Sequence, residues 1–500
     1  MATQFVMFAA FIVVMLYIGI YSRRKATNIK DFYLAGRNLG PWLSSFAYGT
    51  TYFSAVIFVG YAGAIGWNYG MGTLLIAFGN AFLGGMLAWL LLAKRARSMT
   101  QRLDAATMPN FLEKRYGSKH FRIVSALIIF IFLVPYTASV YTGIGYLFEK
   151  AFRIPFEYCM ILMAALTAMY VFFGGYFATA LTDFVQGIIM IAGVVILGFV
   201  IINSPPVGGL SNGLAELGDK ASPLFPFTNA QKGWGIIWLV LLTSLGTWGL
   251  PQMTHKFYTI RDNAAIKRAI VITTVFALII AGGAYFIGGL GRLFIAANEA
   301  GLPTVAGKTI GYDMIIPNIL TSSFIPSWLL GLIIILVLSA SMSTLASLIL
   351  ISSSAISMDL VKGVMFPKMD TKKVHLIMRI MCAVFALASL IIAVKKPAPI
   401  INLMSLSWGA VAGAFIGPFV WGLFWKGTTR AGAWAGIFSG LITVVVLNYI
   451  DVILNIKKLP EQTPMAGAIA MIVSLLIVPL VSLFTKKLSK EKIEECFGDN

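Results

Sequence analysis

The sequence predicts an all-α membrane protein that crosses the bilayer about 13 times. The first observation is composition: 59% of the 500 residues are hydrophobic and 11% are charged, whereas a soluble domain has roughly a quarter of its residues charged. The second is the apolar runs, which continue for about 20 residues, the length that a helix needs to cross a bilayer. Membrane-spanning strands would instead give short segments of alternating polarity.

The apolar runs give the order of the predicted helices. The first run, at about 3–21, is followed rather than preceded by Arg23-Arg24-Lys25. A cleaved secretory signal carries its positive charge before the run, so we expect an uncleaved anchor. Further runs lie at about 44–65, 72–94, 121–148, 157–173, 180–203, 233–254, 268–293, 324–353, 376–394, 399–424, 431–450 and 464–485.

The basic residues predict the orientation in the membrane. About 28 of the 38 Lys and Arg residues fall in alternate connections, at 23–37, 94–122, 256–268, 362–379, 426–430 and 486–492. Basic loops stay in the cytoplasm, so we expect a multi-pass protein of the plasma (inner) membrane with its N-terminus outside and its C-terminus cytoplasmic. The net charge of +19 is then a topology signal and an attraction to anionic lipid, and we expect no nucleic-acid partner.

The sequence shows no motif for a metal centre or for covalent catalysis. The three cysteines, Cys159, Cys382 and Cys496, are far apart and have no paired spacing, so they predict neither a disulfide framework nor a metal site. The apolar runs contain no pair of residues that could act as a catalytic nucleophile and its general base. We therefore expect no enzyme and no organic cofactor.

One apolar run, at about 325–351, is unusually rich in hydroxyl groups. Its hydroxyl side chains are Ser339, Ser341, Ser343, Thr344 and Ser347. On a helix Ser343 and Thr344 project about 100° apart, and the carbonyl of Ala340 lies one turn earlier. These three neutral oxygens suit a small hard cation such as Na⁺. The alternative is that small hydroxyl residues let membrane helices approach closely and hydrogen-bond to each other.

Two of the predicted helices look interrupted. The segment 48–55 reads YGTTYFSA and the segment 244–251 reads SLGTWGLP. Transporters bind ions and substrate where a membrane helix is broken, although Gly and Pro also occur in ordinary membrane helices. The two runs are the second and the seventh, so they enter the membrane in opposite directions. This predicts an inverted repeat of five helices each.

The same count divides the chain into segments. We expect an extra N-terminal helix with a cytoplasmic loop at 1–43, repeat one at 44–203, an external loop at 204–232, repeat two at 233–424, two C-terminal helices at 425–485 and a cytoplasmic tail at 486–500.

Asp183 is the one acid at the edge of an otherwise apolar run, shortly after a cytoplasmic turn predicted at Gly174-Gly175. An ionisable residue at membrane depth is by default functional. The alternative is an acid at the start of a helix that is stabilised by the helix dipole. No Lys or Arg falls at the predicted membrane depth. An anionic solute would therefore rely on helix N-termini or on Na⁺ itself.

Several short motifs resemble the sodium/solute symporter family, and within it the proline and pantothenate branches. They are AGRNLGPW at 35–42, TDFVQ at 182–186, MST at 342–344, SWG at 407–409 and GP at 417–418. The resemblance covers nearly the whole chain. It implies a leucine-transporter-type core with an inverted five-helix repeat, one extra N-terminal helix and two C-terminal helices.

The resemblance also implies a sodium site. Its ligands are the carbonyls of Thr50, Phe53 and Ala340 and the hydroxyls of Ser343 and Thr344. Asp183 matches a family acid linked to sodium coupling. A second sodium site would use Asp183, Ser343, Ser347 and a hydroxyl at position 346, where this chain has Ala346.

For the solute, the resemblance is less direct. Tyr136 and Pro251 match residues near the proline site, but Tyr52 replaces an acid of the proline symporter, and Thr243 and Thr247 replace two aromatic residues. The sugar branch uses several polar side chains where this chain has Asn80. The expected solute-binding residues are Phe53, Ser54, Tyr136, Thr243, Thr247, Trp248 and Trp408.

These observations predict a sodium-coupled symporter that imports a small organic solute, an amino acid such as proline or a small carboxylate, by alternating access. Pantothenate and sugar remain alternatives as solutes. From other classes, a solute-gated channel would need a continuous polar pore, and a transporter-like receptor would carry a signalling domain. We expect a functional monomer whose partners are the solute and membrane lipid, with Na⁺ as the coupling ion.

Overall fold

The computed structural model describes residues 2–22, 33–219, 230–454 and 462–498. Within these residues, nine helices are long and apolar enough to cross a membrane, or ten if the bent pair α11 and α12 is one span. Two shorter apolar helices cover Gln4–Gly19 and Phe156–Thr167. A helical multi-pass membrane protein is therefore confirmed, and the total of 13 spans stays a prediction.

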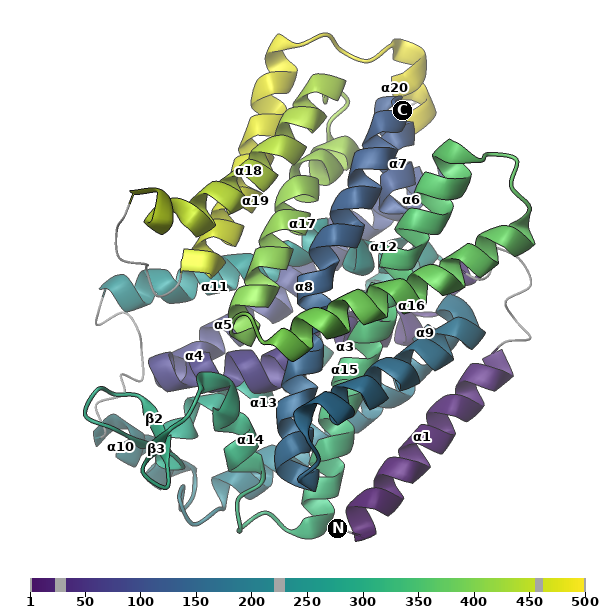
Figure 1. Ribbon diagram of the computed structural model, residues 1–500. Helices are drawn as coiled ribbons and strands as arrows, with labels where there is room; N and C mark the ends of the chain where they lie inside the picture. The colour runs from purple at the N-terminus through teal and green to yellow at the C-terminus, as the bar shows by residue number, and fades with distance from the viewer. Residues whose placement is uncertain (1, 23–32, 220–229, 455–461, 499–500) are drawn as a thin grey trace.

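The helices form one bundle, with the N-terminus and the C-terminus at opposite ends (Figure 1). Up to residue 202 the α-helices are α1 (Ala2–Ser22), α3 (Pro41–Tyr52), α4 (Ala62–Tyr69), α5 (Leu74–Gly79), α6 (Lys94–Arg102), α7 (Met108–Tyr116), α8 (Lys119–Phe152) and α9 (Phe156–Ile202). The π-helical segments Val56–Tyr61, Asn80–Leu87 and Trp89–Ala93 lie between them. Short 3₁₀ turns cover Ala35–Arg37 and Gly70–Thr73.

The later helices complete the bundle. They are α10 (Leu210–Asp219), α11 (Ala230–Gly249), α12 (Pro251–Thr259), α13 (Asn263–Gly289), α14 (Ile315–Leu320), α15 (Ser327–Ser354) with its π-helical extension Ala355–Met365, α16 (Thr371–Lys395), α17 (Ile400–Phe424), α18 (Arg430–Leu454), α19 (Gln462–Phe484) and α20 (Lys490–Phe497). Short 3₁₀ turns cover Gly291–Leu293 and Tyr312–Met314. A small antiparallel sheet of β1 (Ala296–Ala297), β2 (Pro303–Val305) and β3 (Lys308–Thr309) has the order β1-β2-β3.

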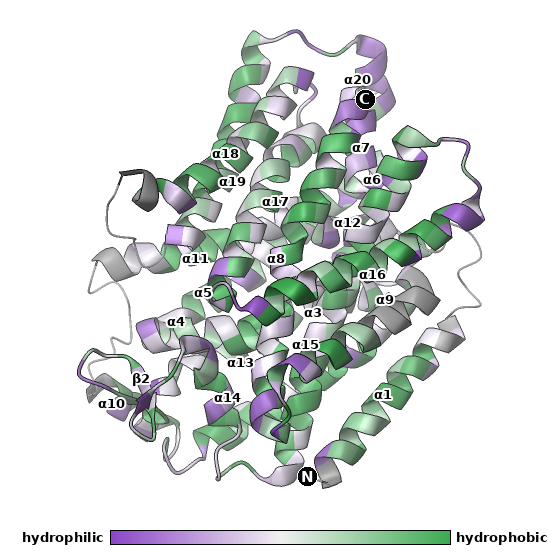
Figure 2. Ribbon diagram, in the orientation of Figure 1, coloured by the Kyte–Doolittle hydropathy of each residue, from purple (hydrophilic) through white to green (hydrophobic). Residues whose placement is uncertain are grey.

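Hydrophobic side chains cover the outside of the bundle as well as its interior. Figure 2 shows hydrophobic residues along α1 and α16, whereas hydrophilic residues gather at α20 and around β2. On α16 the exposed large side chains include Leu376, Ile380, Leu387 and Ile391. A soluble protein rarely exposes so many apolar side chains together, and these surfaces suit contact with lipid.

The first expected break is present. Helix α3 ends at Tyr52, and Phe53 is extended, with φ −106° and ψ 96°. The chain becomes helical again after Ser54, whose side-chain oxygen accepts a hydrogen bond from the Val56 amide at 3.2 Å. Ser54 therefore caps the second half of the broken helix.

The second expected break is also present. Leu250 is extended, with φ −76° and ψ 124°, and Pro251 begins α12, which is bent 47° from α11. Proline has no amide hydrogen and disfavours the helical conformation in the residue before it. Gly249 allows close packing here, since a Cβ atom would lie 2.8 Å from the Ala412 carbonyl oxygen.

The turn expected at Gly174-Gly175 falls on residues 168–175, which lie outside the part of α9 that the structure describes.

Helix α15 lies at the centre of the bundle. In its most apolar window 94% of the residues are buried, and it packs against α9, α8, α1 and α3. Its hydroxyl-rich stretch is therefore enclosed by other helices and does not face lipid.

Candidate functional site

The hydroxyl-rich part of α15 meets the first helix break. The Ser343 hydroxyl lies 3.0 Å from the Thr50 carbonyl oxygen and 3.1 Å from the Ala340 carbonyl oxygen. The Thr344 hydroxyl lies 3.3 Å and 3.1 Å from the same two oxygens. All four residues are fully buried. Four of the five residues expected to bind sodium therefore come together in one dry place.

The break in α3 explains why these carbonyls are available. The last carbonyl groups of a helix have no partner within the helix, and α3 ends at Tyr52. The Thr50 carbonyl accepts hydrogen bonds from Ser343 and Thr344, and the Thr51 carbonyl accepts one from Thr344 at 3.2 Å. Hydroxyl groups can also turn their lone pairs outward, so these oxygens could surround a small cation instead of bonding to each other.

Phe53, whose carbonyl is the fifth expected sodium ligand, follows directly after the end of α3. The Phe53 amide donates to the Gly49 carbonyl at 3.0 Å, and its ring stacks on Tyr52 with centroids 4.4 Å apart. The hydrogen bonds that join α15 to α3 involve Thr50 and Thr51. Thr51 is not among the expected ligands, because its carbonyl becomes available only where α3 unwinds.

Asp183 and Ser347 lie beside this cluster. Asp183 is fully buried on α9, and neither carboxylate oxygen has a hydrogen-bond partner in the described part of the chain. The Ser347 hydroxyl lies 3.0 Å from the Thr51 hydroxyl. Because Asp183 is buried, a functional role explains it better than an interaction with a helix dipole at the membrane surface.

Lys256 lies within a candidate membrane span, although its sequence position predicts a basic cytoplasmic loop and the apolar runs predict no Lys or Arg at membrane depth. It lies on α12, within the bent candidate span, and is 1% exposed. Its ammonium donates to the Ser347 hydroxyl at 3.1 Å. The bend before Pro251 directs α12 toward the bundle, which hydropathy along the sequence does not reveal.

The residues expected to bind solute form two connected groups. The ring of Trp408 lies 5.8 Å from that of Tyr136 and 6.1 Å from that of Tyr52, between centroids. Tyr52 reaches the other group, because its hydroxyl donates to the Thr243 carbonyl at 2.7 Å. The Thr243 hydroxyl in turn donates to the Asn80 side chain at 2.8 Å.

Two further expected residues contact the same π-helical segment, Asn80–Leu87. The Thr247 hydroxyl donates to the Gly84 carbonyl at 2.9 Å, and the Trp248 indole donates to the Leu83 carbonyl at 3.0 Å. The structure thus adds Tyr52 and Asn80 to the expected set. Both residues can be recognised in the sequence as candidates, because each is a polar residue within an apolar run.

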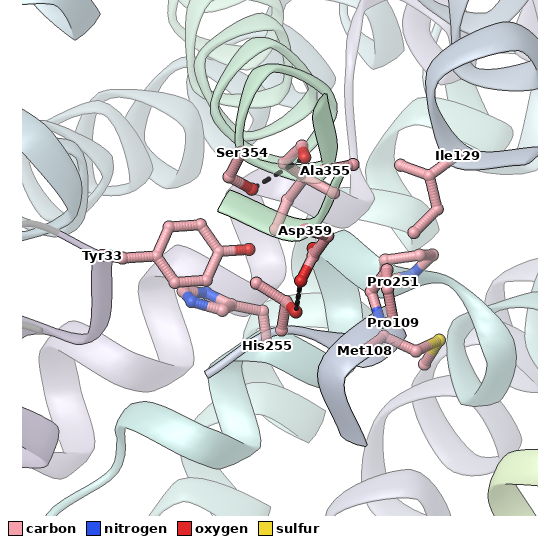
Figure 3. Close-up of a pocket in the computed structure, with 11 residues that line it drawn as sticks. Tyr33, Met108, Pro109, Ile129, Pro251, His255, Ser354, Ala355 and Asp359 are labelled. Carbon is pink, nitrogen blue, oxygen red and sulfur yellow. Dashed lines mark hydrogen bonds between the residues drawn. The ribbon is translucent and has the colours of Figure 1, made fainter. Parts of the chain in front are cut away.

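A second polar cluster lies beside α12, around a small cavity (Figure 3). Asp359 accepts hydrogen bonds from Thr107 at 2.8 Å and from Arg122 at 2.9 Å. Arg122 also pairs with Glu113 at 3.0 Å. Tyr33 and His255 line the cavity together with Thr107 and Asp359. The cluster joins α7, α8 and the π-helical extension of α15.

Two broken helices that meet a third, oxygen-bearing helix at a buried site are typical of secondary transporters. The family comparison agrees with this class: a model described as the sodium:solute symporter family matches residues 32–440. The chain belongs to the sodium:solute symporter family, whose members are transporters and not enzymes.

The relatives include the sodium/proline symporter of Staphylococcus aureus (strain JH9). It is 29% identical over 496 residues, which cover 97% of this chain and 93% of that protein. The family expected from the motifs is thus confirmed. Membership supports coupling to Na⁺ and a multi-pass membrane location.

Solved structures show the same fold. A Na⁺-coupled sialic acid symporter in a substrate-bound outward-open state has a TM-score of 0.78 at 18% identity, over 97% of this chain and 99% of that chain. Mhp1, a nucleobase-cation-symport-1 family transporter in a closed conformation, has a TM-score of 0.53 at 14% identity, over 93% and 97%. These neighbours have the leucine-transporter fold, and at these identities they inform the fold alone.

Proposed function

We propose that this protein imports a small organic solute together with Na⁺ by alternating access. The contact of Ser343 and Thr344 with the Thr50 carbonyl, at 3.0 and 3.3 Å, carries the proposal. It places hydroxyl and carbonyl oxygens from α3 and α15 around one point. An ion at that point would hold the two helices together.

Sodium binding would then set the conformation. The ion shifts the equilibrium only if it binds one state more tightly than the other. When α3 and α15 are in contact, the oxygens of Thr50, Ala340, Ser343 and Thr344 are all available to it. When the helices separate, the oxygens of α3 are lost. Na⁺ therefore favours the form in which α3 and α15 are in contact, and we assign solute binding to that form.

The driving force is sufficient for uptake. One charge moving through about 100 mV supplies ~2.3 kcal/mol, and a tenfold Na⁺ gradient adds ~1.4 kcal/mol. At ~1.4 kcal/mol per factor of ten, one Na⁺ could support roughly 500-fold accumulation. No second energy source is required.

For the solute we propose an amino acid such as proline or a small carboxylate. The relative named above transports proline with sodium, and the aromatic group of Tyr52, Tyr136 and Trp408 is fully buried next to the first helix break. Aromatic faces suit a compact, partly apolar solute, and polar backbone groups at the break suit its polar end. Pantothenate and sugars remain the alternatives.

The orientation and the repeat organisation form part of the same proposal. The N-terminus lies outside and the C-terminus in the cytoplasm, in keeping with their positions at opposite ends of the bundle (Figure 1). The repeats cover 44–203 and 233–424, with one helix before them and two after. The monomer is the functional unit.

Uptake by purified protein in lipid vesicles tests the proposal. With Na⁺ outside and K⁺ inside, radioactive proline, short carboxylates, sialic acid, pantothenate or glucose is added, and accumulation is compared with vesicles that have no Na⁺ gradient. We expect one of these solutes to accumulate only with the gradient and to saturate. Equal flux without Na⁺, or flux that rises linearly with solute concentration, would instead indicate a channel.

A further inference from the structure

Lys256 is the buried cation that the sodium site alone does not explain. It is 1% exposed, and its Nζ atom lies 3.1 Å from the Ser347 hydroxyl and 4.9 Å from the centroid of the Tyr176 ring. Burying an unpaired ammonium group costs several kcal/mol. Its position therefore needs compensation from nearby groups.

Asp183 supplies that compensation. It is fully buried, its two oxygens have no hydrogen-bond partner among the described residues, and it interacts electrostatically with Lys256. The two groups come from α9 and α12, which both pack against α15. Each charge lowers the free energy of burying the other.

A chain of hydrogen bonds connects Lys256 to the oxygens at the first break. The Ser347 hydroxyl accepts from Lys256 and lies 3.0 Å from the Thr51 hydroxyl. The Thr51 carbonyl accepts from Thr344 at 3.2 Å. The ammonium group thus joins the second broken helix to α15, as an ion at Thr50 and Ser343 would join the first broken helix to α15.

The same contacts do not fit a second sodium ion at this place. Ser347 already accepts from the ammonium group, and Ala346 has no hydroxyl to contribute. Two unit positive charges about 4 Å apart repel each other by ~4 kcal/mol at an effective dielectric constant of about 20. The lysine and a second Na⁺ would therefore exclude each other.

We propose that Lys256 serves as a built-in second cation, so that this transporter binds one Na⁺ per chain and moves one per solute. This inference rests on the proposed sodium site at Thr50, Ala340, Ser343 and Thr344. Lys256 acts as a positioning residue: it holds α12 against α15 through Ser347 and provides a positive charge that interacts electrostatically with Asp183.

Equilibrium binding of radioactive Na⁺ to the purified full-length protein tests the inference without knowledge of the solute. We expect the wild type to bind one Na⁺ per chain with a Hill coefficient near one. In Lys256→Met with Ala346→Ser, the charge is removed and the missing hydroxyl is supplied, so we expect two Na⁺ per chain. Lys256→Arg keeps the charge and should keep one.

Lys267→Met is the matched control, because it removes an exposed lysine on the neighbouring helix α13, and it should bind Na⁺ like the wild type. Two Na⁺ bound to the wild type would overturn the inference and leave the proposed function intact. No saturable Na⁺ binding to the wild type would overturn both. If the double variant does not fold, a count of two Na⁺ for the wild type or for Lys256→Arg would still overturn the inference.

Discussion

Replacing Ser343 by alanine removes one oxygen from the contact between α3 and α15. The Ser343 hydroxyl lies 3.0 Å from the Thr50 carbonyl and 3.1 Å from the Ala340 carbonyl, so it is shared by the two helices. A hydrogen bond to a charged group contributes ~1.5–3 kcal/mol, and we use this range for one lost Na⁺ ligand. At ~1.4 kcal/mol per factor of ten, the Na⁺ concentration for half-maximal binding should rise roughly 10- to 150-fold.

The assay is Na⁺ binding to purified Ser343→Ala and Thr344→Ala, together with the Na⁺ dependence of uptake in vesicles. The Thr344 hydroxyl contacts the Thr50 and Thr51 carbonyls at 3.3 and 3.2 Å, so its removal should have a similar effect. Ser341→Ala is the control, because the Ser341 hydroxyl donates to the Val337 carbonyl of its own helix at 2.7 Å and makes no contact with α3 in the hydrogen bonds described above. Wild-type Na⁺ affinity in both folded variants would refute the assigned site.

Three further predictions concern other parts of the molecule. Asp183→Asn removes the acidic group that interacts electrostatically with Lys256. The maximal uptake rate should fall about tenfold or more, ~1.4 kcal/mol, with a smaller change in the half-saturating solute concentration, and a wild-type rate would argue against the proposed role of Asp183. Gly66→Ala should lower stability by ~1–3 kcal/mol, measured by thermal melting, because its Cβ would lie 2.1 Å from the Gly288 carbonyl oxygen. Gly282→Ala, with nothing within 4 Å of its Cβ, should melt near the wild type, and equal losses in both would contradict the packing argument. Burial raises the pKa of Asp313 from 3.8 to about 6; since this pKa is higher in the folded state, ionisation destabilises the fold as pH rises between these two values. From about pH 5 to about pH 7 the wild type should therefore lose ~1 kcal/mol relative to Asp313→Asn, and a difference in melting temperature that does not vary with pH would refute this.

Much of the architecture follows from local sequence. Continuous apolar runs predict membrane helices because an unpaired backbone group in lipid is costly. The two breaks were predictable for the same local reason: Pro251 forces Leu250 out of the helical conformation, and glycine and hydroxyl residues gather before Phe53. Ser343 and Thr344 were identifiable as polar residues within an apolar run.

Other features depended on how distant segments pack. A hydropathy profile scores Lys256 only as a charged residue and therefore assigns it to a loop. In the folded protein the bend before Pro251 directs its side chain onto Ser347. Likewise, the Thr51 carbonyl joins the Thr50 carbonyl in the contact with α15, because the position where α3 unwinds decides which carbonyls meet the neighbouring helix.

The sequence by itself therefore determined which segments cross the membrane, where two of them break and which helix carries the hydroxyl groups. These properties depend on residues within one or two turns of each other. Only the tertiary structure decided that Lys256, which interacts electrostatically with the buried Asp183, lies next to Ser347. A buried charge is stable only beside partners from other helices, and no local pattern specifies which helices those are.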